Sequence, residues 1–192
     1  VSRTRIRHLK YNLHYHALVM TFKEALIEAM AFLAQDERVL FLGQQVAYPG
    51  QAVFETLEKV PMEKRIEMPV AEELQLGIAI GLSLQGYVPV CIYPRMVFVM
   101  RAMDQLVNHL DKLEEMSRGE FIPKVIIRTA VGRSSPLDPG PQHKQDHTEA
   151  LSLMLQKLGI VKIKGAADIE SPYRMALLSS WSWLIIEAPE EV

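Results

Sequence analysis

The sequence has little of several features that mark particular classes of protein. It contains a single cysteine, Cys91, so no disulfide can form within the chain, and we expect a reducing, cytoplasmic location. No apolar run reaches the roughly 18–20 residues needed to cross a bilayer, so no membrane partner is expected. The formal net charge is only −2; because residues 1–19 carry four bases and no acid, the remainder carries −6. A domain of that charge is a poor candidate for binding nucleic acid, and no nucleic-acid partner is expected.

Several common catalytic and binding motifs are also absent from the sequence. It has no G-x-G-x-x-G fingerprint, no Walker lysine loop and no G-x-S-x-G elbow, which removes the usual sequence support for dinucleotide, nucleoside triphosphate and hydrolase sites. No Cys and His spacing suits a structural zinc site. His143, Asp146 and His147 could face one another and hold a metal, but we favour a solvated loop edge and expect no metal ligands in this chain.

The composition is that of a soluble globular domain, with 49% hydrophobic and 23% charged residues. A length of 192 residues accommodates one α/β domain and is short for two. Residues 1–19 lack the apolar stretch of a secretory signal. A transit peptide and a basic nucleic-acid arm are alternatives, but we favour an extension of a domain over 20–192. Thr21 and Glu24 have the spacing of a helix capping box, which predicts a helix start there.

Helical and strand patterns alternate along the domain. Helices are expected over 21–35, 51–59, 71–85, 96–117, 148–158 and 169–181. Strands are expected over 38–43, 65–68, 88–93, 124–129, 160–164 and 183–187. This alternation predicts an α/β fold of three α/β/α layers around a mainly parallel, six-stranded sheet. Such sheets bind ligands outside the carboxyl ends of their strands, and the long loop over 130–147 is expected to be functional.

Three places could carry chemistry, and each also has an ordinary structural explanation. Glu72 and Glu73 fall in the first turn of an expected helix, where acids simply complement the helix dipole. Tyr93 and Phe98 flank a strand end, where aromatic residues usually belong to the core. His143 lies in the long loop, where it could exchange protons near neutral pH or be merely solvated.

Segments of the sequence, taken in order, resemble a known family. These are Leu40–Gly43, Met68–Glu72, Gly77–Gly81, Ala102–Asn108, Lys112–Leu113 with Met116–Ser117, and Gly140–His143. From about residue 20 to 187 the chain resembles the pyrimidine-binding domain of transketolase-like, thiamine-diphosphate-dependent enzymes. It looks most like the β subunit of the decarboxylating first component of 2-oxo acid dehydrogenase complexes, such as the pyruvate, branched-chain and acetoin systems.

The resemblance implies roles for four residues. In the family, the glutamate matching Glu72 hydrogen-bonds N1′ of the aminopyrimidine and promotes the imino tautomer, whose nitrogen removes the thiazolium C2 proton. Phe98 matches the aromatic ring on which the pyrimidine stacks, a contact worth about 1 kcal/mol beyond area burial. His143 matches a histidine that handles the substrate and the transfer to a lipoyl group. Val70 is expected to touch the ring through its backbone.

The sequence departs from the family pattern at several points. Gln44 and Gln45 replace an acidic pair, Lys144 follows the histidine in place of serine, and Arg101 replaces a neutral polar residue. The family's second domain, of about a hundred residues, would follow the last strand, but the sequence ends at Val192 and we expect that domain to be absent.

The Gly-Asp-Gly…Asn pattern that holds the diphosphate through Mg²⁺ in the family is also absent. The resemblance therefore implies a β-type half of a thiamine-diphosphate-dependent 2-oxo acid dehydrogenase, inactive alone. An α-type subunit would bind the Mg²⁺ and diphosphate, in an α₂β₂ or homodimeric assembly. Two alternatives are a non-catalytic assembly or regulatory module of the same fold, and a transketolase-like transferase built from split domains.

Overall fold

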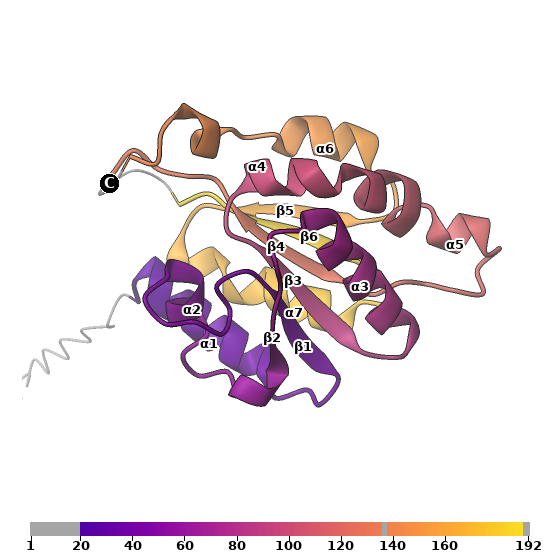
Figure 1. Cartoon of the computed structure of the whole chain (residues 1–192), viewed down its shortest axis with the longest axis horizontal. Helices are drawn as coiled ribbons and strands as arrows, with labels where there is room; N and C mark the ends of the chain where they lie inside the picture. Colours follow the sequence, from indigo (N-terminus) through magenta and orange to yellow (C-terminus); the bar gives the residue numbers. More distant parts are fainter. Residues whose placement is uncertain (1–19, 136–137, 190–192) are drawn as a thin grey trace, which may run out of the picture.

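Six parallel strands form one sheet in the order β2-β1-β3-β4-β6-β5 (Figure 1). The strands are β1 (Val39–Gly43), β2 (Arg65–Glu67), β3 (Val88–Tyr93), β4 (Ile126–Ala130), β5 (Gly159–Ile163) and β6 (Trp183–Glu187). This computed structural model describes residues 20–135 and 138–189, so the basic extension over 1–19 lies outside the described residues. The predicted α/β fold with a six-stranded sheet is confirmed. Because all strands run the same way, their carboxyl ends meet at one edge.

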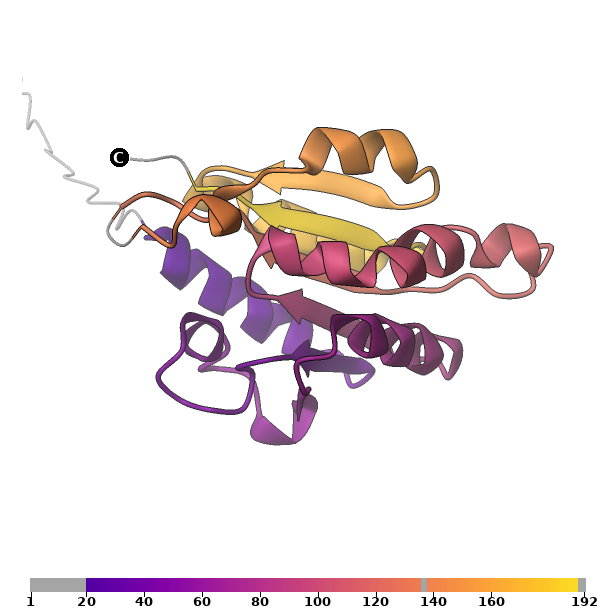
Figure 2. The same cartoon turned by 45° about the horizontal axis from the view of Figure 1, so that its top comes forward.

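Helices cover both faces of the sheet (Figure 2). One face carries α1 (Phe22–Ala34), α2 (Ala52–Thr56) and α7 (Glu170–Leu178). The other face carries α3 (Glu72–Leu84), α4 (Met96–Val99), α5 (Leu113–Met116) and α6 (Thr148–Met154). Shorter turns are η1 (Met62–Lys64), η2 (Met100–Ala102), η4 (Pro141–Lys144) and η5 (Ala166–Asp168), with a π-helix, η3 (Asp104–Leu110). Within the described part of the chain, no helix has both the length and the apolar character required to span a membrane.

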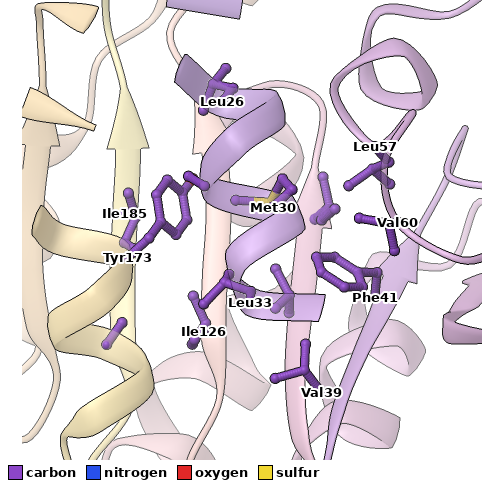
Figure 3. Close-up of a cluster of buried hydrophobic side chains, with 14 of the residues drawn as sticks. Leu26, Met30, Leu33, Val39, Phe41, Leu57, Val60, Ile126, Tyr173 and Ile185 are labelled. Carbon is purple, nitrogen blue, oxygen red and sulfur yellow. The ribbon is translucent and has the colours of Figure 1, made fainter. Parts of the chain in front are cut away.

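Alternating strand residues build one hydrophobic core on each face of the sheet. On the α1 and α7 face, Met30, Phe41 and Tyr173 are almost fully buried (Figure 3). On the α3 face, Leu76 and Cys91 belong to the second buried cluster. Burying each large side chain contributes about 1.5–3 kcal/mol relative to exposure, so the two cores fix the sheet between its helical layers.

The predicted capping box at the start of α1 is confirmed. The backbone N–H of Glu24 donates to Thr21 Oγ1 at 3.2 Å, and the N–H of Thr21 donates to Glu24 Oε2 at 2.8 Å. Two backbone donors of the first turn are thereby satisfied without a tertiary partner.

The expectation of one continuous helix over 96–117 is wrong. The segment passes through α4, η2, the π-helix η3 and α5, and the Asp111 N–H donates to the carbonyl of Leu106, five residues back. Asp111 is buried, and its Oδ1 accepts the N–H groups of Gln156 and Lys157, both at 2.8 Å. The same contact explains why α6 ends at Met154 and not near 158.

Two other helices are also shorter than expected. The carbonyls of Leu57 and Val60 accept hydrogen bonds from the Arg65 guanidinium, so the helix predicted over 51–59 ends at Thr56. The helix predicted to reach 181 ends at Leu178. At the end of α7, the Leu177 carbonyl accepts from Lys124 Nζ and the Ala176 carbonyl accepts from Ser179 Oγ, so side chains satisfy carbonyls that a longer helix would have paired internally.

A matched pair of glycine substitutions tests the close packing of β1 on β3. A Cβ at Gly43 would lie 2.6 Å from the carbonyl oxygen of Ile92, whereas a Cβ at Gly81 in α3 meets nothing within 4 Å. We expect Gly43→Ala to lower the free energy of unfolding by about 1–3 kcal/mol through overpacking. Gly81→Ala should raise it by up to about 1 kcal/mol through helix propensity. Urea unfolding of both variants measures this, and equal effects would contradict the packing described.

The turn between α1 and β1 predicts a pH dependence of stability. Hydrogen bonds from the Arg38 guanidinium lower the pKa of the Asp36 carboxyl to about 2. Since the unfolded value is about 3.9, this contribution is present above about pH 4 and is lost as the pH falls through about 2. Asp36→Asn should lower stability at about pH 6 by less than about 1 kcal/mol, because the pair is partly exposed. Its difference from wild type should vanish near pH 2 in urea titrations; a difference unchanged with pH would exclude the ion pair as its origin.

Candidate functional site

Glu72 is the first residue of α3 and lies at the carboxyl edge of the sheet, with only 8% of its surface exposed. The Tyr93 hydroxyl, at the end of β3, donates to the Glu72 carbonyl at 2.9 Å. Gln44, directly after β1, donates from Nε2 to Glu72 Oε1 at 3.3 Å. Among the described residues, Oε2 receives no hydrogen bond. Two strands thus hold the residue while one carboxylate oxygen stays available to a ligand.

The neighbouring acid has a different environment. Glu73 is exposed, so the ordinary interpretation of an acid beside the helix dipole suffices for it. Tyr93 is 1% exposed and belongs to the core, as the ordinary explanation of that aromatic residue predicts. Its hydroxyl nevertheless fixes the first residue of α3 through the hydrogen bond to the Glu72 carbonyl.

A carboxylate that sequence reasoning missed fixes the loop after β1. Glu67 accepts the backbone N–H groups of Gln45, Val46 and Ala47 at 2.7, 2.9 and 2.8 Å. Gln45 has a left-handed backbone with φ +66°, which turns the chain sharply at this point. The signal available in the sequence was an acid at the end of a short strand, next to the end of another strand. Glu67 therefore positions Gln44 against Glu72.

Glu72 lines a surface pocket of about 600 Å³. The pocket is also lined by Val70, Gly77, Arg101 and Gln105, from the start of α3 and from η2 and η3. Val70 is 82% exposed at the pocket rim, and its contact with a ligand through its backbone stays a prediction. Arg101 gives the pocket a cation that the family pattern does not have.

Phe98 and His143 form a second group at the same edge. Their ring centroids lie 5.5 Å apart with the planes tilted by 59°. The Gly132 N–H donates to the His143 carbonyl at 3.0 Å, and a Cβ at Gly132 would lie 2.5 Å from that oxygen, so the position requires glycine. His143 Nδ1 is buried and has no hydrogen-bond partner among the described residues. Both rings are half-buried and lie on short helices that follow β3 and β4.

The contacts of the described residues place the four predicted residues in two sets. Glu72 and Val70 share a pocket at the start of α3, and Phe98 contacts His143 beside α4. Chemically, the sets offer a carboxylate, an aromatic face and an imidazole near the carboxyl ends of β1, β3 and β4.

Lys144 and His147, two other polar residues of the long loop, have local partners. Lys144 Nζ bonds Asp138 Oδ2 at 2.9 Å and Ser134 Oγ at 3.1 Å, so its charge is paired within the loop. His147 Nε2 lies 2.9 Å from Gln145 Oε1. Over residues 20–135 and 138–189, no group of three or more His, Cys, Asp or Glu side chains is arranged to hold a metal ion.

Asp146, the remaining member of the possible metal set, is bonded to Lys162 and Thr148. Partial burial alone would raise its pKa, but these hydrogen bonds and the Lys162 charge lower the pKa to about 2. The carboxylate therefore stays ionised in its ion pair at neutral pH.

Comparisons with known proteins find curated relatives that are named as beta subunits of dehydrogenases. A Mycobacterium tuberculosis protein, "3-methyl-2-oxobutanoate dehydrogenase subunit beta", is 38% identical over 115 residues, which are 58% of this chain and 32% of that protein. The mitochondrial pyruvate dehydrogenase E1 subunit beta of Caenorhabditis elegans is 33% identical over 134 residues, 68% and 38% of the two chains. The corresponding Bos taurus protein is 35% identical over 133 residues, 67% and 36% of the two chains. The matched region thus spans only about a third of the length of these relatives.

The fold and the family are established by two further matches. A solved split-gene transketolase, described as an inactive β4 tetramer, superposes with a TM-score of 0.69 at 20% identity, covering 91% of this chain and 53% of that one. That likeness supports the fold. Residues 19–185, most of the chain, match the family described as "Transketolase, pyrimidine binding domain". The chain therefore belongs to the transketolase pyrimidine-binding domain family.

Proposed function

We propose that this chain is the β-type half of a thiamine-diphosphate-dependent 2-oxo acid decarboxylase or dehydrogenase. The observation that carries the proposal is the buried Glu72 carboxylate, held by Gln44 and facing a pocket with one oxygen unpaired among the described residues. The β-subunit relatives support the same role. Because the chain spans about a third of those relatives, the substrate, the partner and the activity are all part of the proposal.

The described residues fit the aminopyrimidine end of the cofactor. When bound, thiamine diphosphate supplies a carbon nucleophile that attacks the carbonyl of a 2-oxo acid and accepts the electrons released on decarboxylation. Glu72 binds the pyrimidine nitrogen and exchanges a proton with it, a task that requires a carboxyl group. Phe98 orients the ring by stacking. His143, whose Nδ1 is buried without a partner among the described residues, holds or moves a proton on the substrate side.

The surface around Glu72 supports a site completed by another subunit. Val70, just before α3, is 82% exposed, and Leu74 and Ile78 of α3 are 52% and 37% exposed. An apolar strip beside a buried carboxylate favours burial against a partner. In the proposal an α-type subunit covers this strip and binds the diphosphate through Mg²⁺, in an α₂β₂ or homodimeric arrangement.

The alternative is a non-catalytic module of the same fold. The replacement of the family's acidic pair with Gln44 and Gln45 favours this alternative. The cytoplasmic location expected from the lone cysteine stays a prediction; several relatives are mitochondrial proteins by name.

Neighbouring glutamates provide a matched test of the catalytic role. In the complex of the full chain with its α-type subunit, Mg²⁺ and thiamine diphosphate, we expect Glu72→Gln to lower 2-oxo acid turnover about 10²- to 10⁴-fold. Glutamine keeps the shape and a hydrogen bond but cannot exchange the proton. Glu73→Gln, on the exposed side of the same turn, should leave turnover near wild type. Dye-linked oxidation of pyruvate and of branched-chain 2-oxo acids measures both variants.

The same preparation distinguishes the catalytic half from the non-catalytic module. Calorimetric titration with thiamine diphosphate and Mg²⁺ should show tight binding only when the α-type subunit is present. Tight binding by the isolated chain would refute a site shared between subunits. Unchanged turnover in Glu72→Gln would identify the chain as a module.

A further inference from the structure

Gln44 follows the point where β1 ends between its two neighbouring strands, β2 and β3 (Figure 1). A Cβ at Gly43 would lie 2.6 Å from the Ile92 carbonyl oxygen of β3, so the chain before Gln44 is in close contact with that strand. After Gln44, the Gln45 N–H donates to Glu67 of β2 at 2.7 Å. Contacts with both neighbouring strands therefore determine where the Gln44 side chain leaves the sheet.

The Gln44 side chain meets the carboxylate of Glu72. Its Nε2 donates to Glu72 Oε1 at 3.3 Å, between residues 28 positions apart in the sequence. Within residues 20–135 and 138–189, no other side chain hydrogen-bonds that carboxylate. A primary amide carries no charge and does not titrate, but it is a hydrogen-bond donor. Such a donor favours the charged form of a carboxyl group without competing for its proton.

Other polar and charged groups near Glu72 act on its carboxylate only indirectly. The Tyr93 hydroxyl donates to the Glu72 backbone carbonyl, and burial raises the pKa of that hydroxyl, so it stays neutral. Arg101 of η2 and Gln105 of η3 line the same pocket. The Arg101 charge acts in the same direction as the amide, since a nearby cation favours an ionised carboxyl group. Glu73, the only other acid lining the pocket, lies on the exposed side of the same turn.

We propose that Gln44 is a positioning residue that keeps Glu72 ionised until an aminopyrimidine binds. This role rests on the proposed function, in which Glu72 bonds the ring nitrogen. An acid at position 44, as in the family pattern, would place two carboxyl groups at hydrogen-bond distance, and such a pair keeps one shared proton to higher pH. A carboxylate and an unprotonated ring nitrogen are both acceptors, so the bond between them requires one proton. In this chain that proton comes from solvent when the ring binds, whereas a carboxyl pair would already hold it.

Charge variants of the full chain test this contact without a cofactor or a partner. At about pH 4, Gln44→Glu should unfold in urea much like wild type, because its carboxyl pair holds a proton. As the pH rises to about 8, both carboxyl groups ionise and repel, so its unfolding equilibrium constant should rise about tenfold relative to wild type. Gln51→Glu adds the same charge at an exposed position and should lose no stability over that range.

A double variant separates the charge effect from a general disturbance of the strand end. Gln44→Glu combined with Glu72→Gln again pairs one carboxyl group with one amide, so the rise in the unfolding constant at high pH should disappear. A loss of stability in Gln44→Glu that does not depend on pH, or that persists in the double variant, would overturn the proposal.

Proton uptake on cofactor binding is a second measurement, made on the complex of the full chain with its α-type subunit. Calorimetric titration with thiamine diphosphate and Mg²⁺, in buffers of different ionisation enthalpy, measures this uptake. At about pH 7, wild type should take up about one proton more per site than Gln44→Glu, because the other groups of the cofactor contribute equally to both. Equal uptake would overturn the proposal. Cofactor that binds no more tightly with the α-type subunit than without it would instead contradict the proposed function, and the stability of the double variant would still decide the role of Gln44.

Discussion

The buried ion pair between Arg128 and Glu187 ties together the elements on which the carboxyl edge depends. The arginine comes from β4 and the glutamate from β6, and the Tyr173 hydroxyl of α7 donates to the same glutamate at 2.6 Å. Arg128 Nη1 also donates to Thr56 Oγ1 of α2 at 2.8 Å. Burial alone would lower the Arg128 pKa, but attraction to Glu187 raises it overall, so the arginine stays charged. A buried pair that loses one partner typically costs 3–5 kcal/mol, which explains how one contact can fix two strands and two helices.

Close backbone approaches then determine where functional side chains can lie at that edge. Gly43 lets β1 end against the Ile92 carbonyl, which brings Gln44 to Glu72. Gly132 lets the long loop fold back so that its amide bonds the His143 carbonyl and the imidazole reaches Phe98. The polar side chains are thus positioned by backbone contacts between strand ends, which is a more rigid support than a free loop provides.

Features that depend on contacts between residues close in the sequence could be predicted, whereas features that depend on contacts between distant residues could not. The strand patterns along the sequence predicted the ends of every strand to within two residues. The capping box at Thr21 depends only on a contact with a residue three positions away. The prediction of one helix over 96–117 was wrong, and the side chain of Asp111, where the π-helix ends, is held by partners 45 and 46 residues further along the chain. Glu72 and Phe98 stood out by their positions in the sequence, but roles for them were predicted only because several segments together resembled a family. The carboxylate of Glu67 lies 20 to 22 residues from the amides it holds, and no local pattern reports such a contact.

Two departures from the family pattern, at Gln44 and Lys144, are accommodated by local hydrogen bonds. An acid at position 44 would place a second negative charge at hydrogen-bond distance from Glu72, whereas the Gln44 amide donates a hydrogen bond to that carboxylate. Lys144, the other notable change, directs its charge to Asp138 and Ser134 within its own loop. Neither substitution removes the carboxylate, the aromatic face or the imidazole. The changes therefore alter the electrostatics around the site while preserving the groups on which the proposed function depends.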